Sequence, residues 1–258
     1  MTTTFENGYA EVYDFLYQDK DYLSETQFLI ELHSRLSDRQ LLTRVLDLGC
    51  GTGGHLRYFP ERVFKCGIDK SNQMITRVKA RGIPETVAVQ ADVGYVYLAA
   101  RFDLVYSLFH VLSYQLTDSA VKRILQSISI HLEDSGVAIL DFWHRPAWEF
   151  DPPRNRLTIR QNDERSVVRV SEPSVDYVLS TVSIDITTFI SDRATGSYTS
   201  TNETHCMRAF TLSELESFCV SQGLQVVQSG PWMRHGSSLT ANEWYGWIAL
   251  RRIPSLNR

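Results

Sequence analysis

The sequence lacks the features that mark several large classes of protein. Its 258 residues include only four cysteines, scattered without a CxxC pair, so neither a disulfide framework nor a zinc site is expected. No apolar run approaches the roughly 20 residues that a membrane-spanning helix needs. Residues 1–6 also lack the basic and then apolar pattern of a signal peptide. We therefore expect a cytoplasmic protein with reduced thiols.

Positive charge is not in excess either. Lys and Arg total 26 against 30 Asp and Glu, which gives a formal net charge of −4. Nucleic acids and anionic membranes select basic surfaces, so neither is expected as a partner. The seven histidines are dispersed, and no HxH or HExxH spacing occurs, so no metal is expected. An apolar content of 43% remains, which is ordinary for a globular domain.

Strands and helices alternate along the middle of the chain. Hydrophobic periodicity predicts a short helix that follows the glycines near residue 53 and stops near Pro60, a helix capped by Ser71, and a helix over 118–133. The apolar runs that predict strands lie at 45–48, 63–68, 86–90, 102–108 and 137–142. Strands that alternate with helices at this spacing indicate an α/β fold, a doubly wound parallel sheet with helices on both faces.

The ends of the chain follow other patterns, and we expect four segments within one domain. The first residues have apolar side chains at helical spacing, and alternating apolar residues such as Val182, Ile184 and Ile186 predict antiparallel strands after the fifth strand. The expected segments are an N-terminal helical cap at 1–40, the core at 41–145, a β-rich lid insertion at 146–209, and a completion of the core at 210–258.

The motif with the most chemical content is Val-Leu-Asp-Leu-Gly-Cys-Gly-Thr-Gly at residues 45–53. Three glycines after a buried strand allow a tight turn and let a ligand approach the backbone closely. Asp69 ends the next predicted strand, 18 residues beyond Gly51. A carboxylate at that place accepts hydrogen bonds from ribose hydroxyls, so the pattern predicts a nucleoside cofactor.

The residue sequence of this motif resembles motif I of the class I S-adenosylmethionine (SAM) methyltransferases. Gly-Ile-Asp at 67–69 resembles their second motif, Gln-Ala-Asp-Val at 90–93 their third, and Phe-Asp-Leu-Val at 102–105 the strand that leads to the substrate. The resemblance implies a SAM-dependent methyltransferase that releases S-adenosylhomocysteine. It also implies a Rossmann-like, seven-stranded sheet whose antiparallel last strand, at 243–251, forms an edge.

The resemblance carries cofactor roles over to single positions. The glycines would pack under the amino-acid part of SAM, Asp69 would hold the ribose, and Asp92 would accept from the adenine amino group. Backbone at Ser107 and Leu108 would face the sulfonium. The cofactor-binding candidates are Tyr13, Gly49, Cys50, Gly51, Gly53, His55, Asp69, Lys70, Met74, Ala91, Asp92, Val93, Ser107 and Leu108.

The tyrosine-rich N-terminal helix and the β insertion are similar to those of nucleotide-linked amino-sugar N,N-dimethyltransferases and, more distantly, glycine N-methyltransferases. In the amino-sugar family a tyrosine near the N-terminus covers the cofactor, and Tyr13 matches it best. A polar residue follows the fourth strand in that family. Tyr114 is the best match and His110 the next.

An amine must lose a proton before it attacks a methyl group, and a histidine or tyrosine can accept that proton. The catalytic candidates are therefore Tyr114 and His110, although a purely positional role fits the chemistry equally well. Glu203, His205 and Arg208 are expected to share one face of the last insertion strand. That face is either solvated or points inward. If it points inward, Arg208 could bind a phosphate and Glu203 an ammonium group of the substrate. The substrate-binding candidates are Tyr17, Trp143, Arg145, Glu203 and Arg208.

The predicted function is methyl transfer from SAM to a small polar substrate, in particular to the amino group of a nucleotide-linked sugar. Two alternatives remain open on the sequence. One is O- or N-methylation of another small metabolite, such as glycine or an antibiotic precursor, and the other is SAM binding without catalysis. By analogy with related sugar enzymes we expect a homodimer.

Overall fold

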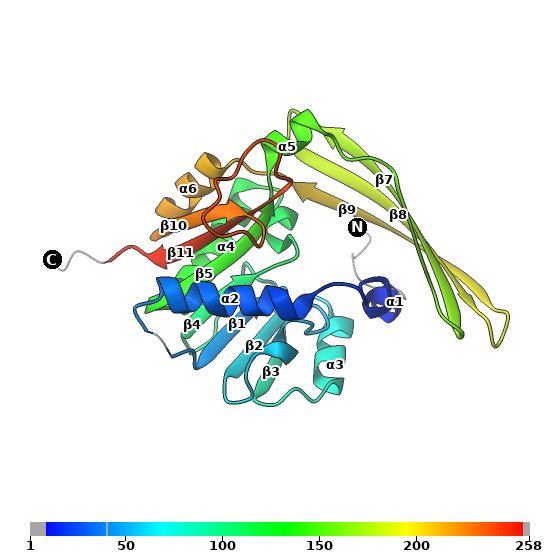
Figure 1. Cartoon of the computed structure of the whole chain (residues 1–258), viewed down its shortest axis with the longest axis horizontal. Coiled ribbons are helices and arrows are strands. Elements are labelled where there is room, and N and C mark those ends of the chain that lie inside the picture. The colour runs from blue at the N-terminus through cyan, green and yellow to red at the C-terminus, as the bar shows by residue number, and fades with distance from the viewer. Residues whose placement is uncertain (1–8, 40, 255–258) are drawn as a thin grey trace.

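The computed structural model describes residues 9–39 and 41–254, so residues 1–6 lie outside the described part. Its core is a seven-stranded sheet in the order β10-β11-β5-β4-β1-β2-β3 (Figure 1). The strands are β1 (Arg44–Leu48), β2 (Phe64–Asp69), β3 (Thr86–Gln90), β4 (Phe102–Ser107), β5 (Leu132–Trp143), β10 (Leu224–Pro231) and β11 (Tyr245–Arg252). Strands β1 to β5 pair in parallel, which confirms the α/β fold class predicted from the sequence.

The last strand is antiparallel as expected, but it does not form an edge. Strand β11 pairs with β5 on one side and with β10 on the other, and β10 is the edge strand. The burial of the two strands gives the reason. The segment Gly246–Leu250 is buried at every position, whereas in β10 only Leu224, Gly230 and Pro231 are buried. A strand that is apolar on both faces is stable inside a sheet, and a half-polar strand suits its rim.

Helices cover both faces of the core sheet. Helices α4 and α6 share one buried apolar cluster with the sheet, and α2 and α3 contribute to another. Side chains cap each of these helices by accepting a backbone N–H, which satisfies donors that have no partner inside the helix. The helices are α2 (Tyr22–Leu36), α3 (Asn72–Ala80), α4 (Asp118–His131) and α6 (Leu212–Ser221).

The segment after the glycine motif differs from the prediction. Turns follow the motif, and only a single 3₁₀ turn, η1 (Leu56–Tyr58), stands where a short helix was expected. Gly51 and Gly53 have φ angles of +52° and +79°, which are left-handed conformations and incompatible with a right-handed helix. With Pro60 close behind, too few residues remain for an α-helix.

The insertion is a separate antiparallel sheet that we call the lid. Figure 1 shows its long strands leaving the core beside α5 (Arg145–Phe150) and passing over α1 (Tyr9–Leu16). Val12 and Leu16 of α1 share an apolar cluster with Met74 of the core and Val167 of the lid, so α1 joins the two sheets. The lid strands are β6 (Arg156–Gln161), β7 (Arg165–Asp176), β8 (Thr181–Asp192) and β9 (Tyr198–Arg208).

Candidate active site

The glycine motif and Asp69 form one hydrogen-bonded unit at the carboxyl end of β1 and β2. The Gly51 N–H donates to Asp69 Oδ2 and the Ser71 N–H donates to Oδ1, each at 2.8 Å. Burial raises the pKa of Asp69, although backbone N–H donors counteract it. Each carboxylate oxygen has a second lone pair, so the side chain still has room to accept from a ribose diol.

The glycine loop is open on the side of Gly51. A Cβ added there would meet no atom within 4 Å, whereas one added to Gly49 would lie 2.4 Å from the Val111 side chain. Val111 begins the 3₁₀ turn η2 (Val111–Tyr114), so this turn packs directly on the loop. The loop therefore has one face packed on η2 and one open face, as a backbone cradle for a ligand requires.

The adenine-side candidates lie on α3 and just after β3. Met74 is 2% exposed, and the Ala91 N–H donates to the Asp69 carbonyl at 3.0 Å, which holds the third motif beside the second. The Asp92 side chain is exposed and accepts from the Gly94 N–H. Val93 is buried among the core residues. Of the other cofactor candidates, Lys70 is exposed and Cys50 is buried, which raises the pKa of the Cys50 thiol.

His55 belongs to a buried charge network. Its Nε2 lies 2.6 Å from Glu25 Oε2, and the Lys20 ammonium pairs with Oε1 of the same carboxylate. Burial alone would raise the pKa of Glu25, but its hydrogen bond to His55 and the charge of Lys20 lower it to about 2. His55 thereby links the glycine loop to α2.

A cavity of about 300 Å³ lies between α1 and the glycine loop. The cations Lys20, Arg57 and Arg81 line it, although Lys20 pairs with Glu25 and Arg81 pairs with Asp14. The sequence analysis selected only Tyr17 from this cavity, because the three cations are far apart along the chain and carry no shared motif. The full lining is Asp14, Tyr17, Gln18, Lys20, Tyr22, Gly54, Arg57 and Arg81.

Strained backbone follows the end of β4. Phe109 and His110 both have φ angles near +65°, and their N–H groups donate to the Asp141 carboxylate at 3.0 and 2.8 Å. His110 Nδ1 lies 3.2 Å from Asp141 Oδ2, and the ring stacks on Tyr245 at 4.7 Å between centroids. Sequence reasoning missed Asp141, although its signal is visible as a carboxylate within an apolar strand. Ser107, the last residue of β4, donates its Oγ–H to the Leu48 carbonyl.

Tyr114 and two lid residues form a buried polar chain. The Tyr114 hydroxyl lies 2.7 Å from His205 Nδ1, and His205 Nε2 lies 3.0 Å from Glu203 Oε2. Glu203 and His205 are 8% and 4% exposed, so their face of β9 points inward. The structure thus brings together three residues that the sequence analysis had selected from two distant segments.

Arg208 does not share that face, contrary to expectation. Side chains alternate along a strand, so the odd-numbered Glu203, His205 and Met207 are buried together and Arg208 points the other way. Its guanidinium pairs with Asp118 and Glu214, which are on α4 and α6. These two carboxylates neutralise the charge that was assigned to a substrate phosphate.

A different arginine occupies the inner face of the lid. Arg169 Nη1 donates to the Tyr17 hydroxyl at 2.6 Å and its Nε to Ser171 Oγ at 3.2 Å. Strand register places Arg169 opposite Thr188, on the same face as Glu203. The sequence analysis missed Arg169, because the position of the lid over α1 is a tertiary feature. Arg145, in contrast, pairs with Glu149 on its own helix, and Trp143 packs in a cluster with Trp148.

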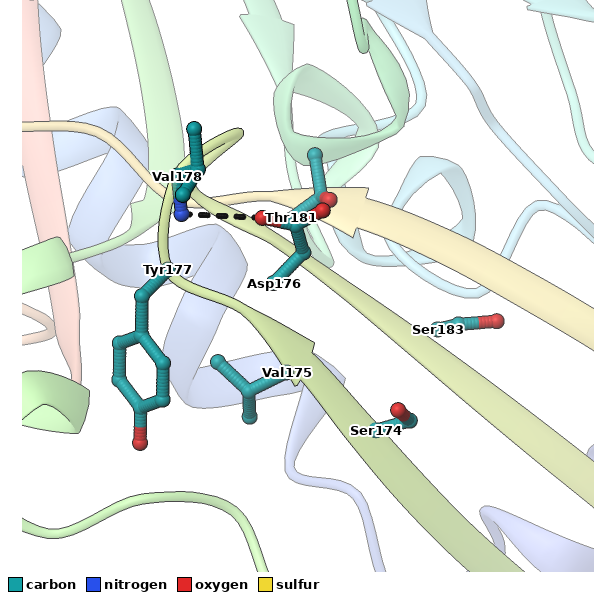
Figure 2. Close-up of a pocket in the computed structure, with 7 residues that line it drawn as sticks. All are labelled: Ser174, Val175, Asp176, Tyr177, Val178, Thr181 and Ser183. Carbon is teal, nitrogen blue, oxygen red and sulfur yellow. Dashed lines mark hydrogen bonds between the residues drawn. The ribbon is translucent and has the colours of Figure 1, made fainter.

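A larger hollow lies elsewhere, at the turn between β7 and β8. The hollow has a volume of about 580 Å³. Figure 2 shows the residues that line it, and none of them is a candidate site residue. Asp176 accepts from the Val178 N–H there, and Val178 is 93% exposed. The hollow is a surface feature of a hairpin turn and not part of the site.

In the part of the chain that the structure describes, no helix has the length and hydropathy of a membrane span, and no cluster of side chains is placed to hold a metal ion.

Comparison with known proteins shows which proteins this chain is similar to. Residues 45–136 match the family described as a methyltransferase domain. A dTDP-3-amino-3,4,6-trideoxy-alpha-D-glucopyranose N,N-dimethyltransferase from Streptomyces venezuelae is 28% identical over 233 residues, which cover 88% of this chain and 95% of that protein.

Solved structures share the whole architecture. DesVI from Streptomyces venezuelae superposes with a TM-score of 0.79 at 23% identity, covering 96% of this chain and 100% of that one. SAM-bound CalS10, an amino pentose methyltransferase from Micromonospora echinaspora, gives 0.74 at 20% identity, covering 97% and 99%. The open glycine loop, with Asp69 beneath it, fits the cofactor that this family uses. Residues 45–136 thus form a SAM-dependent methyltransferase domain, and the chain as a whole is similar to the dTDP-amino-sugar N,N-dimethyltransferases.

Proposed function

We propose that this enzyme methylates the amino group of a nucleotide-linked sugar. The observation that carries the proposal is the buried polar surface on the inner face of the lid. Thr188 Oγ1, Thr201 Oγ1 and Glu203 Oε1 are buried there without a hydrogen-bond partner among the described residues. Buried polar atoms in proteins are nearly always paired, so a ligand that is rich in donors suits this face.

The charges on this face favour an amino sugar over a neutral acceptor. Glu203 offers a carboxylate to an ammonium group, and Arg169 on the same face offers a guanidinium to a diphosphate. The amino-sugar substrates named for the similar proteins support the same substrate class. Neither charge is needed for methylation of an isolated hydroxyl.

The protein's part in the reaction is to position the amine and exclude water. SAM supplies a methyl group that its sulfonium already activates. The glycine loop, Asp69 and Met74 would hold the cofactor. Tyr114, on the turn that packs against the loop, would lie between cofactor and lid. Alignment of this kind supplies much of the rate enhancement in bimolecular reactions.

The test begins with calorimetry, in which SAM should bind to the purified protein. Incubation with SAM and a panel of dTDP-amino sugars should then give products heavier by one or two methyl groups, placed on nitrogen by NMR. The same amino sugars without the nucleotide serve as the matched control and should react far more slowly. Methylation of oxygen, or equal rates with glycine or nucleotide-free sugars, would overturn the proposal.

A further inference from the structure

The polar chain from Tyr114 to Glu203 has the connectivity of a catalytic triad. One hydroxyl contacts one histidine nitrogen, and the other histidine nitrogen contacts a carboxylate, at 2.7 and 3.0 Å. In such an arrangement the carboxylate fixes the tautomer of the ring and stabilises the imidazolium that forms. The remaining nitrogen, Nδ1 of His205, is then the acceptor for the Tyr114 hydroxyl proton.

The chain connects the cofactor side of the site to the lid. Tyr114 belongs to η2, whose first residue, Val111, contacts the glycine loop, while His205 and Glu203 belong to β9. The relay therefore exists only when the lid is docked on the core. A role in lid closure alone would need just one contact, whereas here both ring nitrogens of His205 are engaged.

We propose that Tyr114, His205 and Glu203 form a proton relay that deprotonates the substrate ammonium before methyl transfer. Tyr114 is the catalytic residue, and His205 and Glu203 act through it as positioning residues. The inference rests on the proposed function, because the proton that the relay removes is the one on the substrate ammonium. An amine that is already neutral would not need the relay.

The proton balance of the step is simple. One N–H bond of the ammonium breaks as its proton moves to Tyr114 Oη, and the former Tyr114 proton moves to His205 Nδ1. The amine keeps the electron pair of the broken bond as its lone pair. His205 becomes an imidazolium beside the Glu203 carboxylate and returns its proton to water before the next cycle.

The surroundings of the relay agree with this direction of transfer. Burial raises the pKa of the Tyr114 hydroxyl above its ordinary range, so the tyrosine passes a proton on and does not persist as an anion. The charged and titratable groups that act on Tyr114 are Tyr17 just after α1, Arg169 of β7 and Glu203 of β9. The Arg169 guanidinium favours transient negative charge on Oη, which assists the transfer.

The decisive measurement is kcat and KM against pH for the SAM-loaded enzyme with a dTDP-amino sugar. Tyr114→Phe should lower kcat by about 10²-fold near pH 7, the usual contribution of a general base. Below the pKa of the amine, the free-base fraction rises about tenfold per pH unit, so the deficit should shrink as the pH rises towards 9. Glu203→Gln should show the same trend with a smaller loss, because His205 remains.

Controls separate a relay from a structural role. Cys206→Ser changes the exposed neighbour of His205 and should leave the profile unchanged. Calorimetry should show SAM affinity within about twofold of wild type in every variant. The ¹⁵N NMR signals of His205 should show an unprotonated Nδ1 that shifts in Tyr114→Phe, a readout that needs no turnover.

The possible failures are distinguishable. If the wild-type enzyme methylates no amine, the proposed function falls and the relay falls with it. If wild type is active and the variant profiles run parallel to it at every pH, the relay alone is wrong. A raised KM with unchanged kcat in Glu203→Gln would make that residue a substrate ligand only, which also overturns the relay.

Discussion

At the residue scale, Asp69 joins the glycine loop to the start of α3, and the same carboxylate is predicted to bind the ribose of SAM. It ends β2, and its two oxygens accept from Gly51 in the glycine loop and Ser71 at the start of α3. Its spacing from the glycines made it predictable, because both belong to a local strand–turn–strand pattern. Asp141 and Arg169 were not predictable in this way, since Asp141 accepts from Phe109, 32 residues away, and Arg169 donates to Tyr17, 152 residues away.

Replacing Asp69 by alanine should weaken SAM binding. A hydrogen bond to a charged group contributes about 1.5–3 kcal/mol, so the Kd measured by calorimetry should rise about 10- to 100-fold. Urea unfolding should show a concurrent loss of stability, because two backbone N–H groups lose their acceptor. Asp163→Asn, in an exposed turn, removes the same charge and should change neither quantity. An unchanged Kd in Asp69→Ala would mean that the ribose lies elsewhere.

At the element scale, the sequence predicted those features that depend on the residues of one helix or strand alone. The strand at 86–90 has the predicted bounds, and Ser71 caps α3 as expected. After the glycine motif, the expected short helix is a single 3₁₀ turn that ends before Pro60, and left-handed backbone at Gly51 and Gly53 precedes it. The prediction was wrong about the edge strand, because strand order is set by the competition between β10 and β11 for the place beside β5. Strand order depends on tertiary contacts, and the local hydrophobic periodicity of a strand does not indicate which neighbour it pairs with.

Two glycines provide a matched test of the loop. Gly51 and Gly82 have φ angles of +52° and +60°, and an added Cβ meets nothing within 4 Å at either position. Alanine should therefore cost each a similar backbone strain of about 1–2 kcal/mol in urea unfolding. Only Gly51→Ala places its methyl group in the cofactor cradle, so only it should raise the Kd for SAM, by about tenfold or more. Equal affinities in the two variants would contradict the cradle.

At the scale of the whole molecule, the proposed substrate side of the site is assembled from segments that are distant in sequence. Tyr17 comes from the region of α1, Tyr114 from η2, and Glu203 from the lid. Each residue was visible in the sequence, but their meeting depends on how the lid docks on α1. The apolar cluster that includes Val12, Leu16 and Val167 secures that docking.

Val167→Asp should undock the lid while leaving the core folded. Val167 is fully buried between the lid and α1, and an unpaired carboxylate in such a place costs several kcal/mol. Limited proteolysis should then cleave the lid faster, and KM for the sugar nucleotide should rise at least tenfold, an expected loss of about 1.4 kcal/mol in binding. SAM should still bind, because the glycine loop and Asp69 belong to the core. Leu157→Asp is the control, since Leu157 is 61% exposed on β6 and the new charge would be solvated. If Val167→Asp matched this control in both proteolysis and KM, the site would not depend on lid docking, and the Tyr114–His205 contact would lose its physical basis.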